Sequence, residues 1–273
     1  MNIFRKISLH DTVFPKGGRI VSLVPSQTEL LFDLGLADSV VGVTKFCIHP
    51  AAARERAIIG GTKQVDFDKI AGLKPDLIIG NKEENAQGFM EQLALKYPVY
   101  MSDIYTLDDA YAMISAIGDL TYTAEIAANI RAEIVRNFAL FTKNRGFSAT
   151  NTLPKTCLYL IWQKPYMAAA SNTFIDDMLQ KAGFTNALAD RLRYPALTVD
   201  EIADLQPDCI FLSSEPFPFT EKHIAALRKI CPYTPIRLVD GELFSWYGSR
   251  LRYAPNYFAT LTQEIRHDVF STE

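Results

Sequence analysis

Aromatic side chains are concentrated in loop segments that follow predicted strands. Phe46 and His49 lie in one such segment, Trp162 and Tyr166 in a second, and Tyr194 in a third. Aromatic ring faces stack on flat molecules, so rings placed on polar loops are typical of a ligand-binding cleft. The alternative for any single ring is packing beneath its loop, because tyrosine and tryptophan are often buried. The pattern predicts a ligand-binding role for these five residues.

A further segment near the C-terminus is the richest of all. It contains Trp246, Tyr247, Arg250 and Arg252 within seven residues. The planar guanidinium group of arginine binds carboxylates, phosphates and amides. We therefore expect Trp246 and Tyr247 to stack on a ligand, and Arg250 or Arg252 to hold its polar groups.

Cys47 and His49 are two residues apart, so both side chains would point the same way on an extended segment. Thiolate and imidazole groups bind zinc or iron, but a complete site requires three or four ligands. The alternative is a buried cysteine beside a histidine that lines a pocket. The four cysteines form no C-x-x-C pair, so neither a disulfide scaffold nor a zinc knuckle is expected. We predict no metal site, with Cys47 and His49 as the only candidates for one.

Sequence motifs of catalysis are missing. The chain has no G-x-S-x-G, H-E-x-x-H or Walker A motif, and the run from Gly60 to Lys63 is too short for a phosphate-binding loop. The four histidines form no nucleophile–base arrangement. We therefore predict a binding protein rather than an enzyme, with no cofactor.

The elements that must position these residues alternate between strand and helix. An alternation of this kind is typical of a parallel α/β sheet. At the first turn, Ser26 and Glu29 match a capping box, with each side chain bonded to the backbone of the other. In the first half of the chain, the expected strands are 19–24, 39–43, 75–79 and 99–101. In the second half, we expect a strand at 155–161 and a helix at 174–183.

A long amphipathic helix is predicted over residues 123–144. Apolar side chains recur at steps of three or four, at Ile126, Ile130, Ile134, Phe138 and Phe141. At about 1.5 Å per residue this helix would be roughly 33 Å long, enough to bridge two lobes. A shorter helix precedes it, and we expect an interruption at 118–119.

Two segments of the chain resemble each other. Residues 68–79 and 200–211 share an initial Asp, an Ile-Ala pair, a Pro-Asp turn and an apolar strand. The repeat favours two lobes of similar fold, although helix, turn and strand is also a common connection. We predict an N-terminal α/β lobe over 1–106, a helical connector over 107–145 and a C-terminal α/β lobe over 146–273. Ligands of such proteins bind in the cleft between lobes.

The amino-acid composition excludes several classes of protein. The 273 residues are 48% hydrophobic and 22% charged, with a net charge of −3, which excludes collagen, coiled coil and disorder. The charge provides no basic surface for nucleic acid, and no run approaches the ~18 apolar residues of a membrane span. The first 19 residues lack the apolar core of a signal peptide, so the chain is cytosolic or already processed.

The sequence resembles a known protein family in several of these segments. Residues 19–29, the Val-Gly-Val run ending at Val43, and residues 70–79 resemble the helical-backbone (class III) substrate-binding proteins of ABC importers. Within these they are similar to the cobalamin-binding branch, and the resemblance covers about residues 19–266. It implies two Rossmann-like lobes joined by a rigid interlobe helix. It also implies binding of cobalamin, haem or a ferric siderophore without chemistry, outside the cytoplasmic membrane. We expect the protein to be a monomer.

The resemblance also implies roles for single residues. Pocket positions of the cobalamin binders fall at His49, Trp162, Tyr166, Tyr194, Glu242 and either Arg250 or Arg252. Two tryptophans of the first lobe are replaced by polar residues around 62–63 and at Asn81. A smaller or more polar ligand is therefore an alternative to cobalamin.

Asp68 and Asp200 correspond to acidic residues that, in the family, dock onto arginines of the membrane permease. The alternative is that each caps its helix, where aspartate contributes about 1 kcal/mol, and one residue can do both. A different function also stays open at this point. A cytosolic chelatase-like enzyme of metal-tetrapyrrole metabolism, or a ligand-sensing protein, would use Cys47 and His49.

Overall fold

The structure is a computed structural model that describes residues 14–146 and 156–270. The N-terminal stretch without a signal-peptide core, and most of the polar link between the lobes, lie outside the described residues. The chain divides into two compact units. Unit 1 holds Met1–Ile104, Asp108–Ile134 and Tyr247–Arg250, and unit 2 holds Tyr105–Leu107, Val135–Trp246 and Leu251–Glu273.

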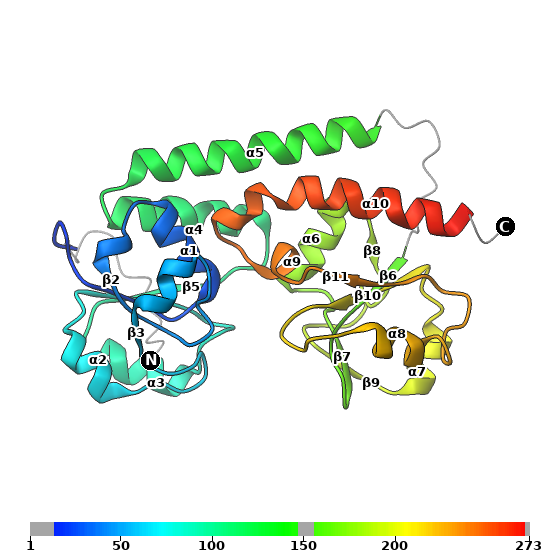
Figure 1. The fold of residues 1–273 in the computed structure, drawn as a ribbon, viewed down its shortest axis with the longest axis horizontal. Helices are drawn as coiled ribbons and strands as arrows, with labels where there is room; N and C mark the ends of the chain where they lie inside the picture. The colour runs from blue at the N-terminus through cyan, green and yellow to red at the C-terminus, as the bar shows by residue number, and fades with distance from the viewer. Residues whose placement is uncertain (1–13, 147–155, 271–273) are drawn as a thin grey trace. The chain divides into compact units, whose positions relative to one another are not determined.

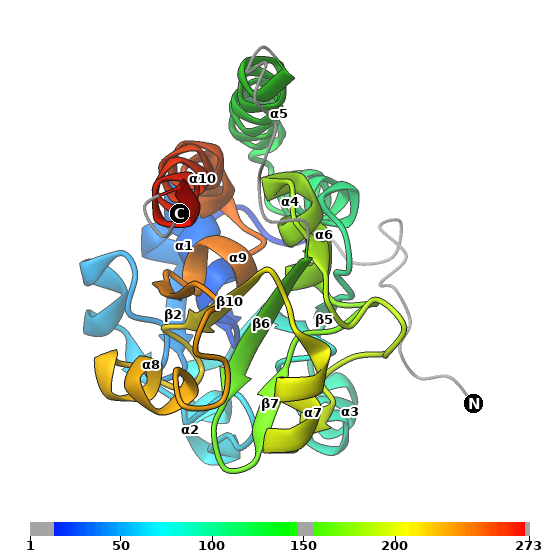
Figure 2. The same cartoon turned by 90° about the vertical axis from the view of Figure 1, so that its right-hand side faces the viewer.

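Unit 1 is built on a five-stranded parallel sheet with the strand order β3-β2-β1-β4-β5. Helices α1 and α4 cover one face of this sheet, and α2 and α3 cover the other (Figures 1 and 2). The strands are β1 (Ile20–Ser22), β2 (Val40–Val43), β3 (Ala57–Ile58), β4 (Leu77–Asn81) and β5 (Val99–Ser102), and the helices are α1 (Pro25–Asp33), α2 (Phe67–Leu73), α3 (Gln87–Ala94) and α4 (Leu107–Leu120).

Unit 2 repeats the three-layer arrangement, with α6, α9 and α10 on one face of its sheet and α7 and α8 on the other (Figures 1 and 2). Its strand order is β11-β10-β6-β7-β9, and β8 also pairs with β6. The strands are β6 (Thr156–Trp162), β7 (Tyr166–Ala168), β8 (Thr185–Asn186), β9 (Ala196–Leu197), β10 (Cys209–Ser213) and β11 (Ile236–Val239), and the helices are α6 (Phe174–Ala182), α7 (Val199–Leu205), α8 (Glu221–Leu227), α9 (Glu242–Ser245) and α10 (Ala254–Phe270).

The second sheet is mixed, whereas the sequence pattern predicts parallel strands only. Strand β7 runs antiparallel to β6, and β9 runs antiparallel to β7. The reason is the short connection between β6 and β7, since a parallel neighbour requires a crossover of a dozen or more residues. The centre of the sheet is parallel, as expected, because β10 pairs with both β6 and β11 in that direction. The expected α/β fold with two Rossmann-like lobes is confirmed.

The internal repeat extends to the backbone. Helix α2 leads into β4, and α7 leads into β10, through turns in which Lys74 and Gln206 adopt left-handed conformations with φ of 47° and 43°. In the first turn Asp76 Oδ2 accepts a hydrogen bond from the backbone N–H of Arg19, at 2.8 Å. In the second, Asp208 Oδ2 accepts from the N–H of Thr156, at 2.7 Å. Each Pro-Asp turn thus fixes the start of the neighbouring parallel strand.

Helix α5 (Ala124–Gly146) is the predicted long helix, and it contributes residues to both units. Its buried stripe contains Ile130, Ile134, Phe138 and Phe141, as expected. Ile126 is exposed instead, and Ala127 takes the buried position. Because α4 and α5 approach closely here, the smaller side chain fits where isoleucine does not.

The expected interruption at Gly118–Asp119 is wrong. Helix α4 continues to Leu120, and the break comes after it, where Tyr122 has a φ of 58°. Gly118 is required for a different reason, since a Cβ at this position would overlap with the Cβ of Ala127 on α5. The glycine permits a close helix–helix approach rather than ending a helix.

Each unit has an apolar interior. In unit 2 the rings of Tyr159, Phe211, Phe244 and Phe258 are fully buried around one another. In unit 1 aliphatic side chains such as Ile70 and Ile78 fill the space between the sheet and its helices. Among the described helices, none is both long and apolar enough to span a membrane.

Candidate functional site

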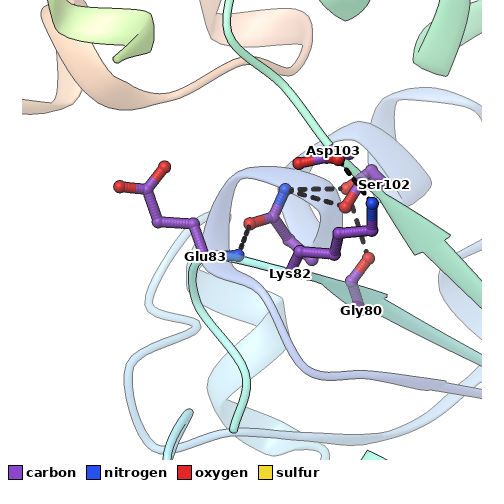
Figure 3. A network of polar contacts seen from close by, with 6 residues as sticks. Gly80, Lys82, Glu83, Ser102 and Asp103 are labelled. Atoms are coloured by element: carbon purple, nitrogen blue, oxygen red, sulfur yellow. Dashed lines mark hydrogen bonds and ion pairs between the residues drawn. The ribbon is translucent and has the colours of Figure 1, made fainter. Parts of the chain in front are cut away.

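The carboxyl ends of parallel strands meet at one edge of a sheet, and ligands of open α/β proteins bind outside that edge. At the end of β4 in unit 1, Asn81 is buried and its Nδ2 donates to Ser102 Oγ of β5 at 3.0 Å. Its Oδ1 accepts from the backbone N–H of Glu83, at 2.8 Å, and of Glu84, at 3.2 Å. Figure 3 shows the polar contacts around Ser102 and Glu83, with the Glu83 side chain pointing away from Ser102. One asparagine thus fixes the loop that follows β4.

A second buried amide joins this loop to the one after β3. Asn85 Nδ2 donates to the carbonyl oxygen of Thr62 at 3.1 Å. Lys63 Nζ donates to the carbonyl oxygen of Glu83 at 2.7 Å. The polar residues around 62–63 and Asn81 are therefore joined in one connected network.

An open hollow of about 780 Å³ lies beside this network, at the ends of β2 and β3. Phe46, a predicted ligand-binding residue, contributes a ring that is 49% exposed, with the Lys45 ammonium 5.0 Å from its centroid. The hollow lies wholly within unit 1. Its lining consists of Lys45, Phe46, Ile58, Gly60, Gly61, Thr62, Lys63, Gln64, Val65, Asp66 and Lys69.

Cys47 and His49, the candidate metal ligands, differ in how deeply they are buried. Cys47 is buried, and its Sγ lies 3.1 Å from Thr28 Oγ1 and 3.2 Å from Thr44 Oγ1. Burial raises the pKa of this thiol, and the two hydroxyl groups only partly oppose the effect. His49 is half-buried. In the part of the chain that the structure describes, no group of three or more His, Cys, Asp or Glu residues could hold a metal ion.

In unit 2, the loop after β6 carries an exposed aromatic face. Trp162 ends β6 with 40% of its surface exposed, and its ring lies edge-on to Phe217 at a centroid distance of 5.5 Å. Tyr166 begins β7 across the same turn, and its hydroxyl oxygen accepts from Gln163 Nε2 at 3.3 Å. Trp162 and Tyr166 thus flank the turn at the carboxyl end of the central strand β6.

Sequence reasoning missed Phe217. It follows β10, which pairs with β6 in parallel, so its loop emerges at the same sheet edge as that of Trp162. Its ring also packs against Phe219 and His223, at centroid distances of 4.8 and 5.3 Å. The repeat over 200–211 ends in a predicted apolar strand, which the structure shows as β10, and this strand is the signal that could have located the aromatic loop after it.

Trp246 and Tyr247 lie in the packed interior, in contrast to the prediction that they stack on a ligand. They are 6% and 7% exposed. Trp246 Nε1 donates to Glu215 Oε1 at 2.9 Å, and Ser245 Oγ donates to the same oxygen at 2.6 Å. Burial raises the pKa of the Glu215 carboxyl group, and these two hydrogen bonds counteract the effect only in part. The physical reason for the burial of Trp246 is this acceptor, which satisfies the indole N–H.

Arg250 forms an ion pair within the protein, so its guanidinium group is not directed at a ligand. Its Nε and Nη2 donate to Glu29 Oε2 and Oε1, at 2.8 and 2.7 Å, and both side chains are mostly buried. The expected capping box of Ser26 and Glu29 is therefore wrong. Helix α1 has Val24 at its N-cap without a side-chain bond, and Glu29 points to Arg250 instead. A carboxylate prefers the two parallel bonds of a guanidinium group to one backbone amide.

The remaining predicted residues of unit 2 are partly buried. The Arg252 guanidinium lies 5.9 Å from the ring centroid of Tyr253. Glu242 begins α9, and its backbone N–H donates to Asp240 Oδ1 at 3.0 Å. Tyr194 lies in the loop before β9, with its ring centroid 5.5 Å from the Arg193 guanidinium.

Asp68 and Asp200 are exposed, but neither caps its helix. The cap of α2 is Asp66, whose side chain accepts from the N–H of Lys69. The cap of α7 is Thr198, which forms a capping box with Glu201. Both predicted caps are displaced by two residues, which leaves Asp68 and Asp200 at equivalent positions in the first turn of the two repeat helices.

Known proteins resemble the chain in sequence. The profile of the family described as periplasmic binding protein matches residues 20–196. A vitamin B12-binding protein of Vibrio cholerae is 26% identical over 197 residues, which cover 71% of this chain and 70% of that protein. A vitamin B12-binding protein of Pectobacterium atrosepticum is 22% identical over 253 residues, covering 91% and 89%.

Solved structures resemble it in fold. The periplasmic vitamin B12-binding protein BtuF of Vibrio cholerae matches with a TM-score of 0.79 and 22% identity, covering 92% of this chain and 99% of that one. A periplasmic heme-binding protein of Pseudomonas aeruginosa matches with a TM-score of 0.79 and 21% identity, covering 90% and 93%. At these identities the likeness concerns the fold.

Proposed function

The chain belongs to the periplasmic binding protein family, and from that premise we propose that it is the solute-binding receptor of an ABC-type importer. It binds its ligand, releases it to a membrane permease and does not change it chemically. The ligand is a corrinoid or another large metal chelate, since the relatives named above are vitamin B12-binding proteins and one structural neighbour is a heme-binding protein.

The observation that carries this proposal is the exposed aromatic face of Trp162 at the carboxyl end of the central strand of unit 2. Trp162 is 40% exposed although its ring edge packs against Phe217, whereas the neighbouring Phe219 is only 5% exposed. Flat macrocycles bind through ring stacking, and α/β proteins bind ligands at this sheet edge. Tyr166 and Phe217 support the same face, while Phe46 supplies an exposed ring in unit 1.

The two tryptophans provide a matched experiment. Titration with cyanocobalamin and with hemin, measured by calorimetry and by tryptophan fluorescence, is expected to saturate for at least one of them. In Trp162→Phe the fluorescence change should be mostly lost and the affinity should decrease. Trp246→Phe, which removes the buried indole, should keep both. If neither compound binds to the wild-type protein, the proposed ligand class is wrong.

A permease is the expected protein partner. Asp68 and Asp200 are exposed and lie at equivalent positions of two repeated helices. Paired acidic residues can bind arginines on a partner through charge-assisted hydrogen bonds. A receptor with this role works outside the cytoplasmic membrane, and we expect the mature protein there.

The chelatase-like enzyme or sensing protein is the other candidate from the sequence, and the family membership does not favour it. Its metal-handling pair would include Cys47, whose sulfur is buried against two threonine hydroxyls. Metal analysis of protein purified without added metal distinguishes the two functions. Stoichiometric metal that is lost in His49→Ala would support the enzyme.

A further inference from the structure

The hollow of unit 1 at the ends of β2 and β3 has an excess of positive charge. We call it the lysine hollow, after its three cationic lining residues Lys45, Lys63 and Lys69. Asp66 is its one acidic lining residue. The whole chain carries a net charge of −3, so a local excess of two positive charges stands out against the rest of the molecule. A charge distribution of this kind attracts anions to one place on a protein.

The single carboxylate of the lysine hollow is already engaged. Asp66 Oδ1 accepts from the backbone N–H of Lys69 at 3.0 Å as the cap of α2. Its Oδ2 lies 3.8 Å from the ammonium group of Lys69. Asp66 and Lys69 therefore offset each other, and the excess charge belongs to Lys45 and Lys63.

Lys45 and Lys63 come from two different loops. The contacts that hold each ammonium group leave some of its N–H donors available to a ligand. Lys63 Nζ donates to the carbonyl oxygen of Glu83, and an ammonium group has three donors in all. The Lys45 ammonium lies over the Phe46 ring, an attraction that uses no hydrogen-bond donor. Both groups can bind an acidic oxygen without breaking these contacts.

An apolar surface adjoins the two ammonium groups. Phe46 is 49% exposed and Ile58 is 40% exposed, and both line the lysine hollow. Large exposed apolar side chains beside cations suit a molecule with a flat apolar body and ionised groups at its edge. A purely inorganic anion would use the lysines and leave Phe46 and Ile58 uncovered.

We propose that the lysine hollow selects anionic chelates: Lys45 and Lys63 bind ionised acidic groups on the periphery of the ligand, and its ring body lies on Phe46 and Ile58. This inference rests on the proposed function and adds to it a substrate class, macrocycles with free carboxylates or a phosphodiester over fully amidated ones. The charge-assisted hydrogen bonds are expected to give a preference of at least about tenfold.

The test compares three soluble corrinoids by calorimetry. Dicyanocobinamide has only amides and a hydroxyl at its periphery, cyanocobalamin has one phosphodiester, and dicyanocobyrinic acid has free carboxylates. We expect at least one of the two acidic compounds to bind about tenfold or more tightly than dicyanocobinamide, and which one it is identifies the acidic group. In Lys45→Gln/Lys63→Gln this preference should decrease to about twofold or less, with little change in the binding of dicyanocobinamide.

The control variant Lys96→Gln/Lys222→Gln removes two exposed lysines outside the hollow and should keep the preference. Equal binding of all three compounds to the wild-type protein would overturn the inference about charge and leave the receptor function standing. A preference that survives in Lys45→Gln/Lys63→Gln would overturn the assignment to the lysine hollow. If neither these corrinoids nor hemin binds, the proposed function fails, and this inference fails with it.

Discussion

Single buried polar side chains decide how the loops of this protein are held. The clearest case is Glu215, a carboxylate that accepts from Trp246 Nε1 and Ser245 Oγ in partly buried surroundings. Because burial raises its pKa, the folded chain binds a proton at this group more tightly than the unfolded chain does. Its contribution to stability is therefore largest below the unfolded pKa, and it is lost as the pH rises through the folded pKa.

Glu215→Gln tests this linkage. The amide keeps an oxygen acceptor for Trp246 and Ser245 but has no charge to desolvate. We expect the free energy of unfolding of Glu215→Gln to depend less on pH, above the ordinary carboxyl pKa of 4.5, than that of the wild-type protein. Urea denaturation across this range measures the effect, with the exposed Glu55→Gln as control. An unchanged pH dependence would contradict the raised pKa.

The Glu29–Arg250 ion pair is the second interaction of this kind. It fixes segment 247–250 to helix α1 within unit 1. Removal of one partner leaves a mostly buried charge without its counterion. We expect Arg250→Ala to cost roughly 2–3 kcal/mol, somewhat less than the ~3–5 kcal/mol of a fully buried pair, because about a seventh of each side chain is exposed.

The control for this pair is the more exposed pair of Arg237 and Glu264, where Arg237→Ala should cost no more than about 1 kcal/mol. Replacement of both buried partners, in Glu29→Gln/Arg250→Met, should recover part of the loss, because no buried charge then lacks a counterion. Urea denaturation of the wild-type protein and these three variants gives the comparison. If Arg250→Ala and Arg237→Ala cost the same, the ion pair is not the fixing contact.

At the scale of the elements, the approach of α4 to α5 depends on the absence of one side chain. A Cβ at Gly118 would overlap with the Cβ of Ala127. We expect Gly118→Ala to destabilise the protein by roughly 1–3 kcal/mol, despite the higher helix propensity of alanine, because the two backbones would have to separate. The midpoint of thermal unfolding measures this change.

Gly72 is the matched control for Gly118. It lies in helix α2, and a Cβ there would meet no atom within 4 Å. Gly72→Ala should therefore stabilise the protein by about 0.5–1 kcal/mol, the ordinary gain of alanine over glycine in a helix. Gly118→Ala/Ala127→Gly should recover part of the loss, since the overlap is removed from the other side. A gain in Gly118→Ala comparable with that in Gly72→Ala would show that the helices have room to spare.

At the scale of the whole molecule, the duplication predicts two equivalent contacts with a permease. Asp68→Lys/Asp200→Lys reverses both charges at exposed positions outside the helix caps. Like charges at an interface cost several kcal/mol, so ligand uptake by cells that depend on this receptor should decrease by about tenfold or more. Ligand affinity in solution should change by no more than about twofold.

Asp204→Lys, an exposed charge reversal in the last turn of α7, is the control for permease docking. It should leave uptake near the wild-type level. Loss of uptake together with loss of ligand affinity in Asp68→Lys/Asp200→Lys would indicate a defect of the receptor itself and count against the docking role.

The sequence alone determined what is local and periodic. Strands β1, β2, β4, β5 and β6, the long helix α5 and the repeat of α2–β4 in α7–β10 follow from patterns of a few residues, because backbone propensity and burial of one face act over short distances. The positions of Trp162 and Phe46 followed as well, since a residue that comes directly after a parallel strand must lie at its carboxyl edge.

Only the tertiary structure shows which side chains form hydrogen bonds or ion pairs with residues far away in the chain. Glu29 and Arg250 are 221 residues apart, and Glu215 lies 31 residues before Trp246. No pattern of spacing encodes such pairs, so the sequence predicted Arg250 and Trp246 as ligand contacts without their internal carboxylate partners. The same holds for the lysine hollow, whose charges come from separate loops that only the sheet brings together.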